Sequence, residues 1–106
     1  MPVLHTLTAQ ESWRGLEGYE PVIKGVGVPG GGSVVAVNYT GRGIVMAISH
    51  DAEPCAIQIK IDGVEKFNST APAVMTLLIG FETSLYVKMS SGGAGGPGTV
   101  SYLKET

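Results

Sequence analysis

The segment SHDAEPC, residues 49–55, gathers four side chains that carry out chemistry in many proteins: His50, Asp51, Glu53 and Cys55. A zinc site requires paired His or Cys ligands at a defined spacing, and the second pair is missing here. A calcium site requires more carboxylates than Asp51 and Glu53 supply. A thiol nucleophile requires a histidine close in space, and only the short separation between His50 and Cys55 suggests one. We therefore interpret this segment as a polar surface loop between two strands.

A second candidate for chemistry is the glycine-rich stretch GVGVPGGGS at residues 25–33. A P-loop requires Gly-Lys-Ser/Thr followed by a helix, and a dinucleotide fingerprint requires a strand before it and a helix after it. This stretch has no lysine at the required position, and a predicted strand follows it. Ser-His-Asp catalysis lacks a nucleophile elbow, and most carboxylates sit at turns or chain ends, unlike the pair of a glycosidase. The sequence predicts no catalytic residue, no metal ligand and no cofactor, and we expect a protein that is not an enzyme.

The composition describes one domain of 106 residues with a formal net charge of −2 and 16 glycines. The seven basic residues are scattered, so neither a nucleic-acid-binding surface nor a basic membrane-binding patch is predicted. The N-terminal residues MPVLHTLTAQ lack the basic and apolar regions of a signal peptide. No stretch reaches the length of a transmembrane helix. We expect a soluble protein that is synthesised in a cytoplasm.

From residue 33 onward the chain is a succession of predicted strands. SVVAVNYT (33–40) and GIVMAISH (43–50) are predicted to form a hairpin through Gly41-Arg42. CAIQIKID (55–62) and the following VEKF form a second hairpin, because Asp62-Gly63 is a strong signal for a type I′ turn.

The remaining strands complete an all-β pattern. AVMTLLIGF (73–81) and SLYVKMS (84–90) form the next predicted pair, and TVSYLKE (99–105) closes the chain. A weak strand is also indicated near Val22. Seven or eight short strands at this spacing predict a single antiparallel β-sandwich with a jelly-roll-like arrangement.

Residues 1–32 are predicted to form an N-terminal arm, separate from a sandwich domain of residues 33–106. TAQE fits a capping box with Thr8 as N-cap and Glu11 at N3, so a short helix is expected over residues 9–17. A helix of this length is unstable alone in water and must pack on the domain or on a neighbouring chain. The arm and interface contacts expected from this segment are Leu4, Leu7, Trp13, Leu16, Tyr19 and Val22.

The distribution of apolar residues over the predicted strands indicates oligomerisation. In IQIKID and LYVKMS one face is apolar, and the other carries Gln58, Lys60, Tyr86 and Lys88, as in a sheet that faces water. In SVVAVNY and AVMTLLIGF both faces are apolar. A domain of this size has one core, so the second apolar face needs a cover, from the arm or from a neighbouring subunit.

A binding module is the alternative to an assembly subunit. Tyr86 is expected to point outward from its strand, as an aromatic platform for a sugar would. The loop SSGGAGGPG at residues 90–98 is open to three interpretations: a ligand-reading loop, a slack connection, or a small-residue surface for close packing. The candidate exposed binding surface therefore comprises Tyr86, Gly93, Gly95 and Gly96.

The succession NYTGRGIVMAIS, IQIKIDGVEKF, FETSLYVKMSS and TVSYLKE resembles small β-sandwich modules in the virion proteins of tailed bacteriophages. Such modules serve as head decoration proteins, head fibres, and tail or baseplate attachments. The resemblance covers residues 33–105 and implies a non-enzymatic particle component that is usually a trimer or another ring.

On this resemblance we expect a homo-oligomeric capsid decoration (cement) protein that stabilises a phage head, with a homotrimer favoured. Its partners would be further copies of itself and the major capsid protein or another virion protein. It would be made in the host cytoplasm and reside in the virion. The alternative is a carbohydrate- or receptor-binding module of a phage tail or fibre, with a glycan as ligand.

Overall fold

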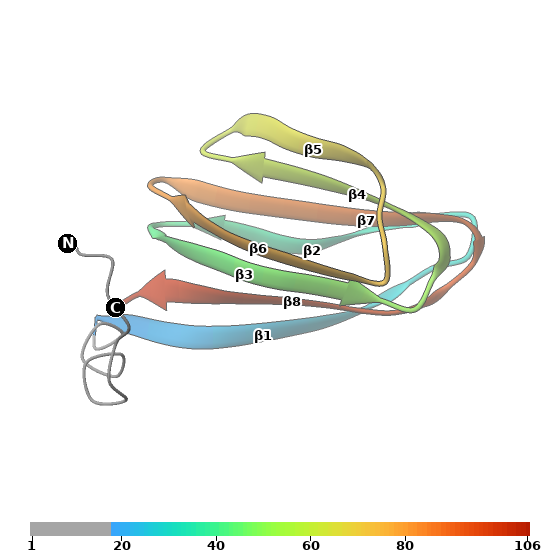
Figure 1. The fold of residues 1–106 in the computed structure, drawn as a ribbon, viewed down its shortest axis with the longest axis horizontal. Helices are drawn as coiled ribbons and strands as arrows, with labels where there is room; N and C mark the ends of the chain where they lie inside the picture. The colour runs from blue at the N-terminus through green and yellow to red at the C-terminus, as the bar shows by residue number, and fades with distance from the viewer. Residues whose placement is uncertain (1–17) are drawn as a thin grey trace.

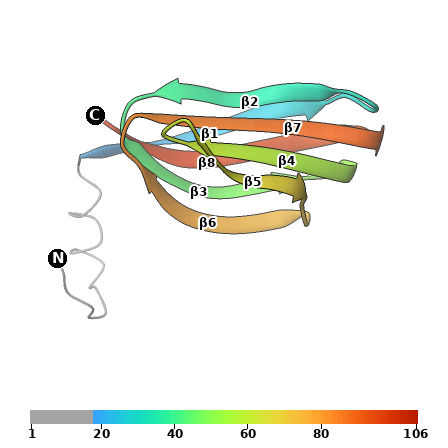
Figure 2. The same cartoon turned by 90° about the horizontal axis from the view of Figure 1, so that it is seen from above.

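The computed structural model describes residues 18–106, which form eight antiparallel β-strands in two four-stranded sheets. The first sheet has the strand order β1-β8-β3-β6, and the second sheet has the order β2-β7-β4-β5. The strands run along the length of the molecule (Figure 1, Figure 2). Their bounds are β1 (Tyr19–Val28), β2 (Ser33–Thr40), β3 (Gly43–His50), β4 (Glu53–Ile61), β5 (Val64–Thr70), β6 (Val74–Phe81), β7 (Ser84–Ala94) and β8 (Gly96–Glu105). The prediction of an all-β antiparallel sandwich is confirmed.

The strands pair as one long hairpin that is folded over between the two sheets. β1 pairs with β8, β2 with β7, β3 with β6 and β4 with β5, so each pair is nested around the turn at Asp62-Gly63. Further ladders join β8 to β3 and β7 to β4 and complete each sheet. Among the described strands, only β4 and β5 are neighbours both in the chain and in a sheet. This nested pairing is the jelly-roll arrangement.

Two of the three predicted hairpins are wrong. β2 and β3 lie in different sheets, and so do β6 and β7. The connection at Gly41-Arg42 therefore crosses from one sheet to the other, with Gly41 at a φ of 146°. Alternating residues predict a strand from local sequence, whereas the partner of that strand lies far along the chain, as in the pairing of Ser33 with Ser90.

The predicted boundary between arm and sandwich at residue 33 also differs from the structure. Residues 19–28 form β1, an edge strand that pairs with β8 over its whole length. Val22, Val26 and Val28 of this strand belong to or pack against the core. The glycines between these valines obscure the alternation that would otherwise mark the strand. The predicted helix, its N-cap and the other arm residues up to residue 17 lie outside the described residues.

The core lies between the two sheets and is densest beneath the central strands β4 and β7. The buried apolar side chains of these two strands are Cys55, Ile57, Ile59, Ile61, Leu85, Val87 and Met89. At one end of the sandwich, Tyr39 of the second sheet contacts Phe81 and Tyr102 of the first, with ring centroids 6.0 and 5.6 Å apart. Each large apolar side chain that is fully buried contributes about 1.5–3 kcal/mol to stability. These contacts hold the two sheets face to face.

The turn between β4 and β5 has the predicted type I′ geometry, with φ 54° at Asp62 and 81° at Gly63. The Asp62 carboxylate accepts hydrogen bonds from the backbone N–H groups of Glu82, Thr83 and Ser84, at 2.9, 2.7 and 3.1 Å. These bonds connect the centre of the nested hairpin to the β6–β7 connection. The bond from Thr83 above all, together with those from Ser84 and Glu82, holds the pKa of Asp62 below its ordinary value of 3.8.

The substitution Asp62→Asn should lower the thermal unfolding temperature, because it removes the charge that these N–H groups bind. Asparagine tolerates a positive φ, so the turn itself is preserved. The folded-state pKa of Asp62 is depressed, so its contribution is complete above about pH 3.8 and is lost as the pH falls through the folded-state value. Thermal unfolding followed by circular dichroism from pH 7 to pH 2.5 should show the difference between wild type and variant shrinking at the acid end. Asp51→Asn is the matched control, and a pH-independent difference for Asp62→Asn would contradict the assignment.

Candidate functional site

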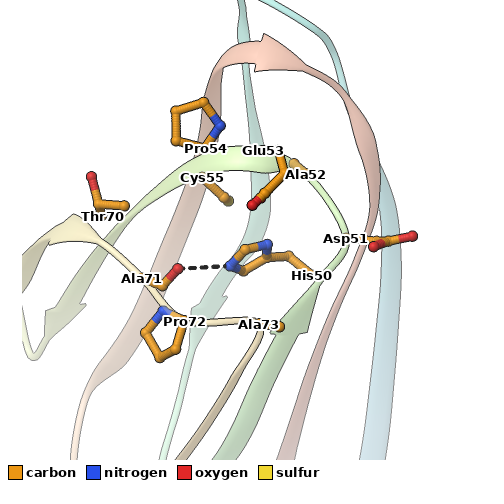
Figure 3. Close-up of a pocket in the computed structure, with 10 residues that line it drawn as sticks. All are labelled: His50, Asp51, Ala52, Glu53, Pro54, Cys55, Thr70, Ala71, Pro72 and Ala73. Carbon is orange, nitrogen blue, oxygen red and sulfur yellow. Dashed lines mark hydrogen bonds between the residues drawn. The ribbon is translucent and has the colours of Figure 1, made fainter.

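The residues that could bind a ligand or a partner lie on three surfaces of residues 18–106. The first surface is a hollow of about 310 Å³ between the β3–β4 and β5–β6 connections (Figure 3). His50 lies at its centre and donates a hydrogen bond from Nε2 to the carbonyl oxygen of Ala71, 3.0 Å away. Its Nδ1 is buried and has no hydrogen-bond partner among the described residues. The hollow is lined by His50, Asp51, Ala52, Glu53, Pro54, Cys55, Thr70, Ala71, Pro72 and Ala73.

The side chains in this hollow support packing more than chemistry. Cys55 is buried, and desolvation raises the pKa of its thiol, so the nucleophilic thiolate is disfavoured. The side chain of Asp51 projects away from His50 (Figure 3). No group of three metal-ligating side chains occurs within residues 18–106. Ala52 and Cys55 are buried, so the segment predicted as a polar loop is in part a packing element.

The glycine run at residues 90–98, predicted as a loop, belongs largely to strands β7 and β8. A β-carbon added at Gly93 would lie 2.7 Å from the Glu53 carbonyl oxygen, and one at Gly96 would lie 2.6 Å from that of Asp51. One at Gly95 would overlap the backbone of the β1–β2 turn. These glycines therefore allow three backbone segments to pack closely where β7 crosses to β8. Of the three interpretations left open by the sequence, close packing is the one that the geometry favours.

The outer face of the second sheet is the second surface, and it is polar as predicted. Tyr86 points outward, as expected, and the Lys60 ammonium lies 5.2 Å from the centre of its ring. Glu65 accepts hydrogen bonds from the amides of Gln58, at 2.7 Å, and Asn68, at 3.3 Å. A shallow hollow of about 250 Å³ lies between these amides and Lys88. Lys60 thus forms a cation–π contact with Tyr86, and the role of Tyr86 as a platform for a sugar stays a prediction.

The third surface is the outer face of the first sheet. Tyr102 and Val45 are buried neighbours in the ladder, so the residues that alternate with them point away from the core. The strand register arranges these outward residues in rows of four across β1, β8, β3 and β6. The rows are Pro21–Leu103–Ile44–Gly80, Ile23–Ser101–Ala47–Thr76 and Gly25–Thr99–Ser49–Val74. We call these residues, together with the outward Leu78, the apolar face.

The apolar face contains no charged residue, and three of its apolar side chains are exposed while Ile44 and Leu103 are half-buried. Ile23 is 76% exposed, Val74 65% and Leu78 62%. Four strands about 4.8 Å apart and eight residues of about 3.3 Å outline roughly 500 Å², an outline that also includes the hydroxyl side chains of Ser49, Thr76, Thr99 and Ser101. The largest apolar patch on a typical monomer is roughly 300–600 Å² and is often functional. Charged residues gather instead at one end of the sheet, where Arg42 forms ion pairs with Glu82 and Glu105.

The structure corrects where the second apolar surface lies. The strand at residues 74–81 does have two apolar faces, as predicted. In β2 a bulge between Val35 and Val37 turns both Ala36 and Val37 inward, which leaves Val35 as the outward apolar residue. Sequence reasoning missed Ile23 on this surface, because its segment was assigned to the arm.

Of the residues predicted to form the arm and its interface, the structure describes Tyr19 and Val22. Val22 points into the core, so it is not available to a partner in the way predicted. Tyr19 lies half-buried at the start of β1, opposite Glu105. The other predicted contacts, Leu4, Leu7, Trp13 and Leu16, lie outside the described residues. Within residues 18–106 no helix is long and apolar enough to cross a membrane.

Comparison with known proteins gives little further information. No protein-family model matches the chain, and no curated protein matches it. Among solved structures, the core of the Drosophila protein NLP, described in terms of pentamer formation and histone binding, matches with a TM-score of 0.48 and 15% sequence identity. The match covers 82% of this chain and 98% of that one. A similarity of this extent carries no argument about function.

The substitution Gly95→Ala tests whether the glycine run is structural. Its methyl group would overlap backbone atoms of Val28 and Gly30, so the free energy of unfolding should fall by about 1–3 kcal/mol. Gly92→Ala is the matched control, because its methyl group would meet only Pro54 Cγ at an ordinary 3.8 Å. Urea unfolding of both variants gives the comparison. Equal stability of the two variants would contradict the packing role.

Proposed function

We propose that this protein is a non-enzymatic, homo-oligomeric structural subunit of a virus particle, acting as a capsid decoration protein of a tailed phage. The observation that carries the assembly part is the apolar face, which is uncharged and exposes Ile23, Val74 and Leu78. The resemblance of residues 33–105 to virion modules supports the particle part. A trimer is the oligomer that the resemblance favours. We propose that a second copy of the chain covers the apolar face.

The exposed apolar side chains supply a reason for assembly. Fully burying a side chain of the size of Ile23, Val74 or Leu78 is worth about 1.5–3 kcal/mol each. The ion pairs of Arg42 border the apolar face at one end of the sheet, and protein interfaces likewise combine an apolar centre with a polar rim. A capsid multiplies such contacts over many copies, and this raises the total strength of attachment.

The sheet edges are less suited to assembly than the face. An open edge invites a neighbouring strand, and proteins protect edges with proline, charge or bulges. The β1 edge carries Pro21 and Lys24, and the β5 edge carries Glu65 and Lys66. The β6 and β2 edges each contain a bulge or irregularity in their pairing. Assembly through the face therefore remains as the favoured mode.

Size-exclusion chromatography with light scattering should give a mass that is a multiple of the 11.0 kDa chain, and three chains are expected. Ile23→Glu should shift the protein toward the monomer, because assembly would bury its charge. Leu78→Asn should do the same without added charge, and asparagine suits the φ of 54° at this position. Val35→Glu is the matched control, because Val35 is an exposed apolar residue on the opposite face.

All three variants should keep the circular dichroism spectrum of the folded wild type, since the sites are exposed within a single subunit. A monomeric wild type would overturn the proposal. An oligomer that is weakened by Val35→Glu as strongly as by Ile23→Glu would place the interface elsewhere and would contradict the role of the apolar face.

The placement on a particle has a separate test. Phage particles whose genome encodes this chain should contain the protein. Immunogold labelling with antibodies against the protein should mark the whole surface of the phage heads. Labels confined to tail or fibre tips would support the attachment module instead of the decoration protein. If the protein is absent from purified phage particles, the proposed virion role is overturned, but the proposed homo-oligomer is not.

A further inference from the structure

We infer that the N-terminal segment of one copy, residues 4–16, lies on the apolar face of a neighbouring copy and completes the interface. This inference rests on the proposed homo-oligomer and names the segment that covers part of the face. Each subunit would thus place its own N-terminal segment on the apolar face of a neighbouring subunit.

The size of the apolar face argues for an additional contributor. A stable interface buries about 800 Å² on each partner, whereas the sheet offers roughly 500 Å² from its strand spacing and length. The sequence of residues 4–16 can supply the difference, because a buried aromatic side chain such as Trp13 covers about 150–250 Å². Leu4, Leu7 and Leu16 add further apolar surface.

The segment joins the described part of the chain at the start of β1, the edge strand of the sheet that bears the apolar face. The carbonyl oxygen of Gly18 accepts hydrogen bonds from the backbone N–H of Thr106, at 2.9 Å, and from its hydroxyl, at 3.1 Å. Gly18 thus extends the β1–β8 ladder by one position beyond the pair of Tyr19 and Glu105. The segment is therefore attached at one end of the sheet, next to Pro21 and Ile23 of the apolar face.

The length of the segment is sufficient for this exchange. The thirteen residues 4–16 span at most about 43–47 Å when extended, or about 20 Å as a helix. A strand of eight residues measures about 26 Å. When extended, the segment is long enough to follow the apolar face of an adjacent subunit from one end to the other, and as a helix it covers most of that length.

Trp13 is the only tryptophan in the chain, so its fluorescence reports on this segment alone. In the wild-type oligomer its emission should be shifted to the blue and protected from acrylamide quenching. Ile23→Glu should shift the emission to the red and raise the quenching constant severalfold, while Val35→Glu should leave both unchanged. A wild-type oligomer with fully quenchable, water-like Trp13 emission would overturn the inference and leave the homo-oligomer in place.

Cross-linking distinguishes a neighbour's segment from the chain's own. Leu7→Cys and Ile23→Cys are made in separate chains, one with a mass tag, then mixed, reassembled and treated with a short bismaleimide. Cys55 is buried and its thiol pKa is raised, so it should react slowly. Cross-links between the two different chains are expected. A second sample is a double variant that carries both substitutions in one chain. Cross-links found only within one chain of this double variant, or none in either sample, would overturn the exchange.

Truncation separates failure of this inference from failure of the proposed function. A chain that begins at Glu17 keeps all eight strands and should remain folded by circular dichroism. It should have a dissociation constant for self-association at least tenfold weaker than that of the full chain. If the full chain is monomeric, the proposed function fails. If the folded truncated chain assembles as tightly as the full chain, only the N-terminal segment's role fails.

Discussion

The turn at Asp62-Gly63 is the constraint on which the rest of the fold depends, because every strand pair is nested around it. Its two positive φ angles bring β4 and β5 together. From there each earlier strand meets a later one, ending with β1 and β8. The Asp62 carboxylate also binds the backbone of residues 82–84, so the β6–β7 connection is attached to the same turn. One acidic side chain in a type I′ turn thereby serves both a local and a long-range purpose.

The two outer faces of the sandwich differ in a way that the fold itself does not require. The face of the second sheet satisfies its own polar groups, as in the bonds from Gln58 and Asn68 to Glu65 and the stacking of Lys60 on Tyr86. The apolar face of the first sheet carries no charged side chain and exposes Ile23, Val74 and Leu78. Because the edges of both sheets carry protective features, the proposed assembly depends on this single apolar face.

The histidine, cysteine and glycine residues that suggested a catalytic or binding site in the sequence mostly serve packing in the structure. Cys55 is a buried apolar residue beneath β4, and His50 fixes the β5–β6 connection through its bond to the Ala71 carbonyl. The glycines between β7 and β8 allow backbone segments to approach more closely than any side chain would permit. An absence of side chain, rather than a recognition role, explains why glycine is concentrated there.

The sequence by itself determined the class of fold, the type I′ turn and the polar outer face at Gln58 and Tyr86. Each of these depends on local alternation or on two turn residues, which act over a few positions. The tertiary structure alone decided which strands pair, that β1 belongs to the sandwich, and that Ile23, Ile44 and Leu103 share one surface. These three residues lie on three different strands, and only the register between distant parts of the chain brings them together. A pattern that marks which residues alternate does not specify the partner strand, because pairing is set by the whole core and by backbone crossings such as Gly41.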